Sequence, residues 1–266
     1  MARSRLTAEP VFKRPRLLFR IVSAITSALN VCPSIYDAVR HVPLTATLSP
    51  VFRSSNITSI SIPSSVTRIG KKAFNYCCEL NKVVFQKDSK LQIIDDYAFD
   101  QSSIKSISIP LNVIRIGSFA FNGCKNLQYV EMPNDLNLHQ IEKYTFASTS
   151  IKNIAIPNSV NKIGEKSFYN CKNLEQINFD DNNSMLQIIE KRAFSLSPMI
   201  KNLLIPSKVE IIEEKFIDKK LQLIKISSNN PYFKIYDDKF LIKKSSINQS
   251  DYDQLVICLC NIERIQ

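Results

Sequence analysis

The chain is poor in the residues that most catalytic and cofactor sites need. It has four glycines, two histidines and no tryptophan among its 266 residues. Four scattered glycines supply no Gly-rich loop that could cradle a phosphate. The histidines, His41 and His139, lie in different regions, and neither belongs to an H-E-x-x-H motif or a Cys-His constellation. The sequence therefore predicts a protein that is not an enzyme and that needs no cofactor.

Membrane-spanning runs and metal-ligand motifs are also missing. The apolar stretch at residues 17–32 is shorter than the ~20 residues that a spanning helix needs, and Arg20 interrupts it. No integral membrane span is therefore expected. The seven cysteines include no C-x-x-C pair with a nearby histidine, so no metal site is predicted.

The charged residues are numerous but dispersed. The formal net charge of +11 at pH 7 would suit an anionic partner. Within most of the chain, however, lysine alternates with Asp, Glu, Asn and Ser, a pattern typical of a solvated surface, and nucleic acid is not an expected partner. Adjacent carboxylates fall in turn-like stretches, where a capping role is preferred over acid-base catalysis. These pairs are Asp95 and Asp96, Asp180 and Asp181, and Asp237 and Asp238.

Internal repetition is the dominant feature of the chain. Three segments share one pattern: residues 57–80 (ITSISIPSSVTRIGKKAFNYCCEL), 104–127 and 151–174. Each opens with apolar residues at i, i+3 and i+5 and continues with Pro, a Val-x-x-Ile step, Gly, and a Phe followed three residues later by Cys. Segments of a second type keep the apolar frame but lack the Gly and Cys. They are residues 80–104, 127–151 and 174–200.

One series of phenylalanines gives the period. Consecutive members are separated by 25, 22, 25, 22, 26 and 22 residues, so two repeats form a superperiod of 47 or 48 residues. A unit of this length cannot bury its apolar face alone, and stacking on neighbours supplies the core. The series comprises Phe74, Phe99, Phe121, Phe146, Phe168, Phe194 and Phe216.

Each repeat is predicted to contain one short strand and one turn of helix. Alternate apolar residues, such as Ile107 and Ile109, would point into the core beneath a parallel sheet. Gly117 would supply a turn, and the S-F-A-F segment after it would form a short helical turn that places Phe121 inside. The predicted fold class is an α/β solenoid with a parallel β-sheet on its concave face and short helical or irregular convex segments.

Three cysteines share one repeat position. Cys77, Cys124 and Cys171 recur at intervals of 47 residues, which places them two layers apart in a stack. Layers of strands ~4.8 Å apart put their Cα atoms roughly 10 Å from one another, beyond the ~7 Å that a disulfide can span. These residues are predicted to be free, small buried hydrophobes, and they do not reveal the redox compartment.

The repeat unit I-P-x-x-V-x-x-I-G-x-x-A-F-x-x-C-x-x-L resembles the BspA-type leucine-rich repeat of bacterial surface antigens, which is greatly expanded in some parasitic protists. The match covers about residues 57–221, and the N-N-P-x-F module at residues 229–233 is similar to the family's terminal unit. The resemblance implies a leucine-rich repeat horseshoe and a role in adhesion at the cell surface. Two departures stand out: Ile212 replaces the turn Gly, and Asp-Asp-Lys at residues 237–239 replaces the usual D-G pair.

Three regions are predicted. Residues 1–55 form an N-terminal basic and apolar segment with a linker, residues 56–221 form the repeats, and residues 222–266 form a terminal hairpin-like module followed by the start of a truncated further repeat. The first region holds seven of the eleven arginines. Its residues 17–32 fit a signal peptide, a helix that caps the open end of the solenoid, or a gene-model artefact, and these alternatives stay open.

The outward residues of the predicted strands form the candidate binding surface. Tyr129 is the one aromatic residue among them and is therefore the expected anchor for a protein partner. The predicted function is that of a non-enzymatic, protein-binding leucine-rich repeat protein, a surface antigen or adhesin-like protein. The alternatives are an intracellular scaffold or a truncated gene fragment, so localisation is open between the cell surface or secretion and the cytoplasm. The candidate contact residues are Lys82, Ser106, Ser108, Tyr129, Glu131, Asn153, Gln176, Asn178 and Asn202.

Overall fold

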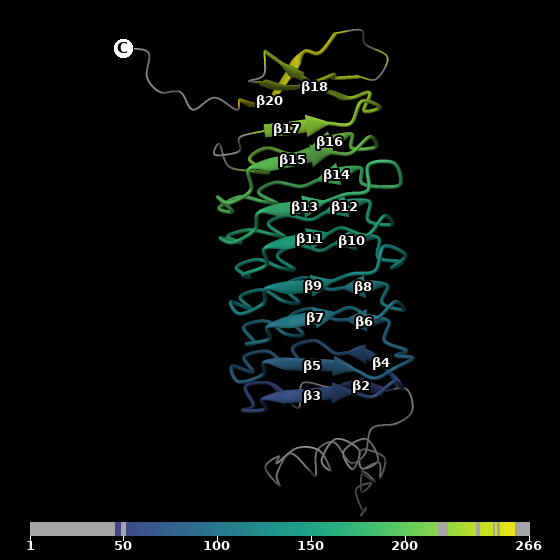
Figure 1. The fold of residues 1–266 in the computed structure, drawn as a ribbon, viewed down its shortest axis with the longest axis vertical. Helices are drawn as coiled ribbons and strands as arrows, with labels where there is room; N and C mark the ends of the chain where they lie inside the picture. The colour runs from purple at the N-terminus through teal and green to yellow at the C-terminus, as the bar shows by residue number, and fades with distance from the viewer. Residues whose placement is uncertain are drawn as a thin grey trace, which may run out of the picture. The chain divides into compact units, whose positions relative to one another are not determined.

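The computed structural model describes residues 46–48, 52–217, 223–237, 240–246, 248 and 251–258. They all lie within one compact unit, Leu44–Gln266. The predicted signal or cap segment at residues 17–32 and His41 lie outside the described residues, as do residues 259–266 of the segment 255–266 that was expected to restart a repeat. The described part is a stack of turns along one axis (Figure 1).

Short parallel strands line one side of the stack, which we call the first wall (Figure 1). Their side chains alternate as the sequence predicts: in β7 (Ser106–Ser108), Ile107 is buried between two exposed serines. Because the side-chain period of a strand is two, the buried residues line the core and their neighbours face solvent. The other strands of the first wall are β3 (Ser59–Ile62), β5 (Lys82–Phe85), β9 (Tyr129–Glu131), β11 (Asn153–Ala155), β13 (Gln176–Asn178), β15 (Asn202–Ile205) and β17 (Leu223–Ile226).

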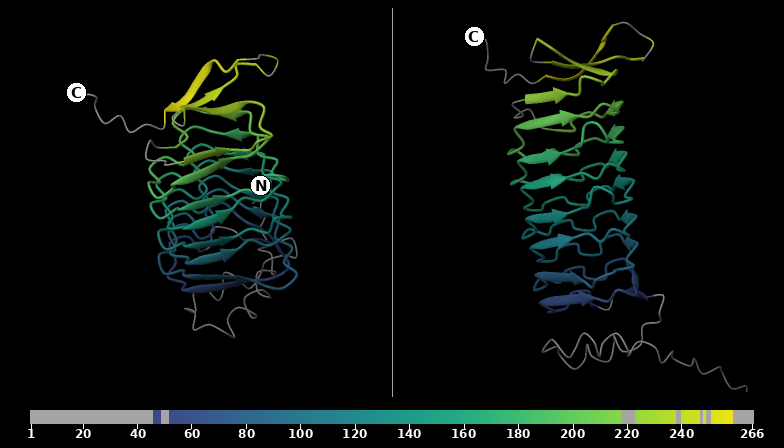
Figure 2. Two further views of the ribbon diagram at one scale, coloured as in Figure 1. Left: turned by 45° about the horizontal axis from the view of Figure 1, so that its top comes forward. Right: turned by 45° about the vertical axis from the view of Figure 1, so that its right-hand side comes forward.

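A second row of parallel strands, which the sequence pattern did not predict, forms the second wall (Figure 2). It is built from the Val-x-x-Ile step, and in β4 (Val66–Ile69) both Val66 and Ile69 are buried. Strands repeat at the same ~4.8 Å spacing on both walls, so the turns stack as a column and the expected horseshoe is not formed. The other strands of the second wall are β2 (Ala46–Leu48), β6 (Ile93–Ile94), β8 (Arg115–Ile116), β10 (Gln140–Ile141), β12 (Lys162–Ile163), β14 (Ile188–Ile189) and β16 (Ile211–Ile212).

The predicted helical turn before each core phenylalanine is wrong. Residues 71–76 form linked turns, in which the Phe74 N–H donates to the Ala98 carbonyl of the next layer at 2.7 Å and the Asn75 N–H donates to the Lys72 carbonyl at 3.3 Å. Lys72 has a φ of 61°, a left-handed conformation that a right-handed helix does not allow. The turns therefore replace helical bonds with bonds between layers, and they continue the ladder along a third side of the column.

The repeat glycines allow close approach between layers and do not supply a left-handed turn. A Cβ atom added at Gly117 would lie 2.6 Å from Asp96 N and 2.8 Å from Asp95 C, both in the preceding layer. At Gly164 it would lie 2.7 Å from the Ile141 carbonyl oxygen. Any larger side chain at these positions would force the two layers apart.

A column of stacked phenylalanine rings fills the core beside the turns. Seven rings, beginning with Phe52 and ending with Phe194, stack with centroid separations from 5.0 Å to 5.6 Å. Fully burying one such side chain contributes about 1.5–3 kcal/mol, and an aromatic pair adds about 0.5–1.5 kcal/mol. The repeat places one ring in every layer, so the column is continuous. Phe52 belongs to it although it lies in the segment that was predicted to be a linker.

The repeat cysteines are free, as predicted, but they are also hydrogen-bond donors. The Sγ of Cys124 donates to the Phe99 carbonyl oxygen at 3.0 Å, and the Sγ of Cys171 donates to that of Phe146 at 3.1 Å. Burial raises the pKa of the Cys124 thiol to about 12 and that of Cys171 to about 11. These thiols stay protonated at neutral pH, which suits a structural role and not that of a nucleophile.

An antiparallel sheet lies at the C-terminal end of the described residues. It comprises β18 (Phe233–Tyr236), β19 (Phe240–Lys243) and β20 (Gln254–Cys258). Asn230 joins this sheet to the repeats, because its buried side-chain amide donates to the carbonyl oxygens of Pro206 and Val209 at 2.8 Å and 3.0 Å. The Asn-Asn-Pro module therefore supplies hydrogen-bond donors to two backbone carbonyl groups of the last short turn of the stack.

In the last complete repeat Ile217, and not Phe216, occupies the position of the core phenylalanine, since the Phe194 N–H donates to the Phe216 carbonyl oxygen at 2.7 Å, as the Phe168 N–H donates to that of Ala193 at 2.9 Å. Ile212 pairs with Ile189 in the second wall, so it does not replace the turn glycine as predicted from the sequence. Glu213 occupies that position instead, since its N–H donates to the Ile189 carbonyl oxygen at 2.9 Å, as the Gly164 N–H donates to that of Ile141 at 2.8 Å.

Candidate functional site

The outward side chains of the first wall form two parallel rows, which we call the first-wall face. The register of the parallel strands determines which side chains are neighbours within a row. Ser106 lies beside Tyr129, and Ser108 lies beside Glu131. Neighbouring strands lie ~4.8 Å apart, so one outward side chain of each row recurs at about that distance along the column. The first row comprises Lys82, Ser106, Tyr129, Asn153, Gln176, Asn202 and Leu223, and the second comprises Val84, Ser108, Glu131, Ala155, Asn178, Leu204 and Lys225.

The structure places all nine residues predicted as contacts on this face, and all nine are exposed. The alternation of apolar and polar residues along each strand was sufficient to identify them, because every second residue of a strand points into the core. Tyr129 is 62% exposed and is the one exposed aromatic side chain on the described first-wall strands. The small polar Ser106 lies beside it in register, and Asn153 is an exposed polar residue of the next strand, β11.

The first-wall strands associate in pairs that follow the superperiod. Four residue pairs join β3 to β5, whereas one joins β5 to β7. Among the described strands, no ladder pair joins β9 to β11 or β13 to β15. Two hollows lie at these seams, one of about 520 Å³ beside Val84 and Leu111 and one of about 260 Å³ beside Asn178 and Asn202. The face is thus ridged and hollowed, which gives a protein partner more shape to fit than a flat sheet would.

The second wall, in contrast, carries paired charges. Arg115 forms ion pairs with Asp95 at 2.8 Å and Asp96 at 2.7 Å, and Arg68 also pairs with Asp95. Burial alone would raise the pKa of the Asp95 carboxyl, but hydrogen bonds from Arg68 and Arg115 outweigh it and lower that pKa. Lys162 pairs with Glu190 at 3.2 Å. These groups hold neighbouring layers together, because each pair joins residues from different turns.

Carboxylates also cap the turns, as the sequence predicts for the Asp pairs. The Asp95 Oδ1 accepts the Asp96 N–H at 3.0 Å, and the Asp180 Oδ1 accepts the Asn183 N–H at 3.3 Å. Glu190 extends the pattern between layers, since its Oε2 accepts the Glu165 N–H at 2.7 Å. These acids are engaged with backbone donors, which accounts for their positions without acid-base chemistry.

Asp100 is a buried carboxylate on the turn side. Its side chain accepts hydrogen bonds from the Asn75 amide at 2.9 Å and the Asn122 amide at 2.8 Å, each from an adjacent layer. Burial raises the pKa of the Asp100 carboxyl, and the hydrogen bonds from Asn122 and Asn75 act in the opposite direction. The three side chains form a polar ladder that sequence reasoning missed, because its members lie 22 and 25 residues apart.

The described residues do not bring together a catalytic or metal-ligating set that the sequence analysis overlooked. His139 is exposed between β9 and β10, and within the described ranges no cluster of three or more His, Cys, Asp or Glu side chains could hold a metal ion. No helix of the described part has the length and hydrophobicity needed to cross a bilayer.

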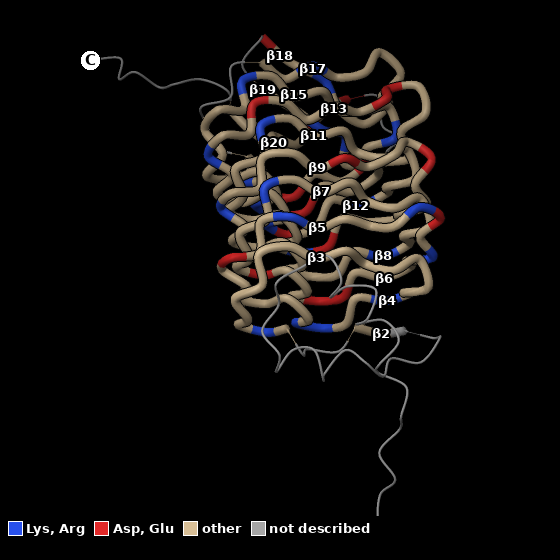
Figure 3. The backbone as a smooth tube through the Cα atoms, turned by 60° about the horizontal axis from the view of Figure 1, so that its bottom comes forward, with Lys and Arg blue, Asp and Glu red and all other residues tan. Residues whose placement is uncertain are grey.

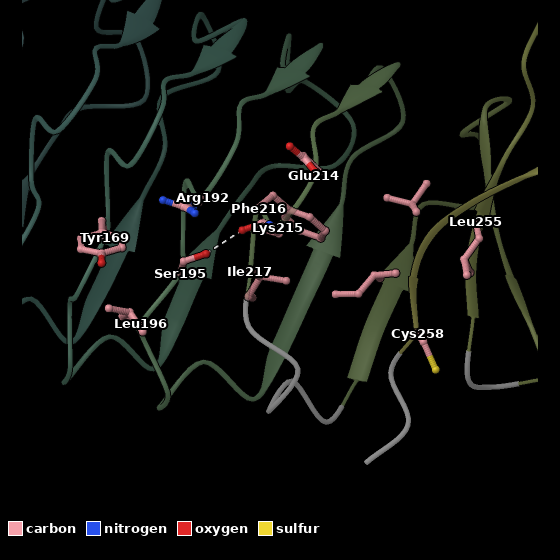
Figure 4. Close-up of a pocket in the computed structure, with 12 residues that line it drawn as sticks. Tyr169, Arg192, Ser195, Leu196, Glu214, Lys215, Phe216, Ile217, Leu255 and Cys258 are labelled. Carbon is pink, nitrogen blue, oxygen red and sulfur yellow. Dashed lines mark hydrogen bonds between the residues drawn. The ribbon is translucent and has the colours of Figure 1, made fainter. Parts of the chain in front are cut away.

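A pocket of about 690 Å³ lies between the last turns of the repeats and β20 (Figure 4). Phe216 and Leu255 contribute apolar surface, while Arg192 and Lys215 contribute positive charge. The hydroxyl of Ser195 donates to the Lys215 carbonyl oxygen at 2.6 Å and is already engaged. The sequence could not indicate this pocket, because a strand from the terminal module lies against repeat residues some 40–90 positions earlier in the chain.

Comparison with protein families yields one match. The model of the BspA type leucine rich repeat region matches in six copies, over residues 47–140 and 139–256. This range begins before the first repeat identified from the sequence and includes most of the terminal sheet. No curated protein matches the sequence significantly.

Several solved structures are similar to this chain. A leucine rich cell surface protein from Faecalibacterium prausnitzii A2-165 is 22% identical, with 71% of this chain and 69% of that chain covered and a TM-score of 0.43. A leucine-rich repeat protein from Eubacterium ventriosum is 22% identical, with 66% and 50% covered and a TM-score of 0.47. The pneumococcal vaccine antigen PcpA is 20% identical, with 65% and 63% covered and a TM-score of 0.33.

Proposed function

The chain belongs to the BspA type leucine-rich repeat family, and from this premise we propose that it is a non-enzymatic binding protein, a surface antigen or adhesin-like protein that recognises a protein partner through the first-wall face. The observation that carries the proposal is the arrangement of that face. It presents two exposed rows of side chains around one projecting aromatic ring, Tyr129. Solenoids commonly bind partners along such an extended surface.

The composition of the face supports a protein ligand. Its centre is small and mostly uncharged, with Ser106, Ser108 and Asn153 near Tyr129, and few groups there would have to give up strong hydration on binding. An exposed tyrosine combines a large contact area with a hydroxyl that can donate or accept a hydrogen bond. The hollows at the seams could take side chains from the partner.

An intracellular scaffold of the same fold is a second candidate, and one observation favours it. The cysteines of the described residues carry free thiols, including exposed Cys78. Exposed thiols persist more readily in a reducing compartment than outside the cell. The two candidates share the binding face and differ in the compartment.

Labelling of intact cells separates the two candidates. An antibody to residues 151–174 would be applied to unpermeabilised cells, alongside biotinylation and brief protease treatment. Surface labelling, with loss of the antibody signal after protease, would support display. Detection that requires permeabilisation, together with resistance to external protease, would contradict the surface proposal and direct the search for partners to the cell interior.

A further inference from the structure

A line of lysines follows the edge at which the first-wall strands begin. Lys105, Lys152 and Lys201 directly precede β7, β11 and β15, while Lys125 and Lys172 lie in the turns that lead into β9 and β13. We call these five residues the lysine edge. They fall on five consecutive turns of the column, and all five are exposed. Figure 3 shows Lys and Arg segments on many turns of the column, interspersed with Asp and Glu.

Backbone hydrogen bonds place Gln128 and Glu175 beside Lys105 and Lys152 in the next layers, and Lys125 and Lys172 lie three residues earlier in those layers. The Lys105 N–H donates to the Asn81 carbonyl oxygen at 3.2 Å, and the Lys105 carbonyl oxygen accepts the Gln128 N–H at 2.9 Å. The Lys152 carbonyl oxygen likewise accepts the Glu175 N–H at 2.8 Å. With layers ~4.8 Å apart, lysines on alternate turns recur at roughly 10 Å, and the three from Lys105 to Lys201 span about 19 Å.

The lysines of this edge form no ion pair among the described residues. Among the described residues, no carboxylate oxygen lies within 4.0 Å of any lysine in the line, although Glu175 shares the edge. The cations that do have such partners are Arg68, Arg115, Lys162 and Lys166. They lie on the second wall and the turn side. The lysine edge therefore presents ammonium groups that an anionic chain could contact.

We propose that the lysine edge binds a sulfated polysaccharide laid along the axis of the column. Lysine ammonium groups are compact, hydrated point charges on flexible stems, which suits sulfates that repeat along a flexible chain. Binding of single-stranded nucleic acid usually adds a series of aromatic side chains on which bases stack. The described first-wall strands offer one exposed aromatic residue, Tyr129, so the observations favour the polysaccharide.

The test uses immobilised heparin as the probe and a matched pair of triple variants. One carries Lys105→Gln, Lys152→Gln and Lys201→Gln. The control carries Lys71→Gln, Lys143→Gln and Lys191→Gln, which removes the same charge from three exposed lysines on the turn side. We expect the first variant to bind roughly tenfold more weakly or worse, with the slope of log Kd against log salt reduced in magnitude by about 2, and the control to change little.

Three outcomes would overturn the proposal. Equal weakening of both variants would mean that heparin responds to net charge and not to this edge. Unchanged binding by the first variant would exclude these lysines. Equally tight binding of heparin and of single-stranded DNA with the same number of charges would assign the edge to nucleic acid or to any polyanion. Tyr129→Ala should leave heparin binding unchanged, which keeps this test separate from that of protein recognition, and circular dichroism would check that each variant folds.

Discussion

The two walls of the column use their outward side chains differently. On the second wall, Arg68 and Arg115 are partly covered and pair with Asp95, which ties adjacent layers together. Tyr129 on the first wall, and Lys152 on the lysine edge beside it, are exposed and make no ion pair or ring contact within the described residues. Repetition alone therefore does not mark a binding surface. A repeated outward position serves stability where its side chains meet between layers, and it is available for a partner where they do not.

Replacing a core ring should give the largest loss of stability, and it should distinguish core positions from first-wall positions most clearly. Phe121→Ala is expected to lower the free energy of unfolding by about 3–5 kcal/mol, because it removes a fully buried ring and interrupts the stack. Tyr129→Ala, on the first-wall face, should change it by less than about 0.5 kcal/mol. Urea denaturation followed by circular dichroism measures both. Similar losses in the two variants would show that the first-wall face is also part of the stabilising structure.

Closing the space between layers should give the next largest effect. Gly117→Ala places a Cβ 2.6 Å from Asp96 N and 2.8 Å from Asp95 C, so adjacent layers must shift, at a cost of about 1–3 kcal/mol. Ser108→Ala, on the exposed face of the first wall, serves as the control and should be nearly neutral. The midpoint of denaturation would be compared for the two. A stable Gly117→Ala variant would mean that the layers can part at this point without loss.

Removing a second-wall ion pair should have a moderate effect with a defined pH dependence. Asp95→Asn should lower stability by about 1 kcal/mol at pH 7, whereas Lys152→Gln on the lysine edge should have no measurable effect. Because folding lowers the pKa of Asp95, its contribution is present above the unfolded-state pKa and is lost as pH falls through the folded-state pKa. Unfolding measured between pH 7 and pH 3 should therefore show the variant and the original protein converging. A constant difference across that range would contradict the ion-pair account.

Asp100 should show the smallest effect, with the opposite sign. Folding raises the pKa of this carboxyl, so the folded state binds the proton more tightly than the unfolded state does. The contribution of Asp100 to stability is therefore full below the unfolded-state pKa and is lost as pH rises through the folded-state pKa. Asp100→Asn should flatten that part of the profile while keeping one acceptor oxygen for the amide of Asn75 or Asn122. Thermal unfolding of both proteins at a series of pH values between 3 and 7 checks this. A profile that is unchanged in the variant would exclude Asp100 as the titrating group.

The sequence was sufficient for the first-wall face and insufficient for most of what surrounds it. Alternation of Ile107 with Ser106 and Ser108 identifies a strand and its outward side chains, because a period of two is a local property. The second wall was not predicted, because Val66 and Ile69 are three residues apart and both buried, and this spacing fits a turn of helix equally well. Its two-residue strands exist only through pairing between layers.

Backbone conformation and long-range contacts account for the other differences. The left-handed conformations of Lys72 and Phe119, with φ of 61° and 59°, are held by hydrogen bonds to the next layer, and no local propensity predicts them for these residue types. The ion pair between Asp95 and Arg115 joins residues 20 positions apart. Such contacts depend on the exact register of the stack, which a repeat length alone does not give.

We propose that the first wall binds a partner and that the second wall does not. Benzoylphenylalanine, a photo-activated crosslinking residue, would be placed at Tyr129 on the first wall in one protein and at Ile211, an apolar second-wall residue that is 40% exposed, in another. After irradiation of cells that produce each protein, we expect a discrete crosslinked protein from position 129 and none from position 211. Crosslinks from position 211 alone, or the same products from both positions, would contradict the assignment of the first wall as the binding surface.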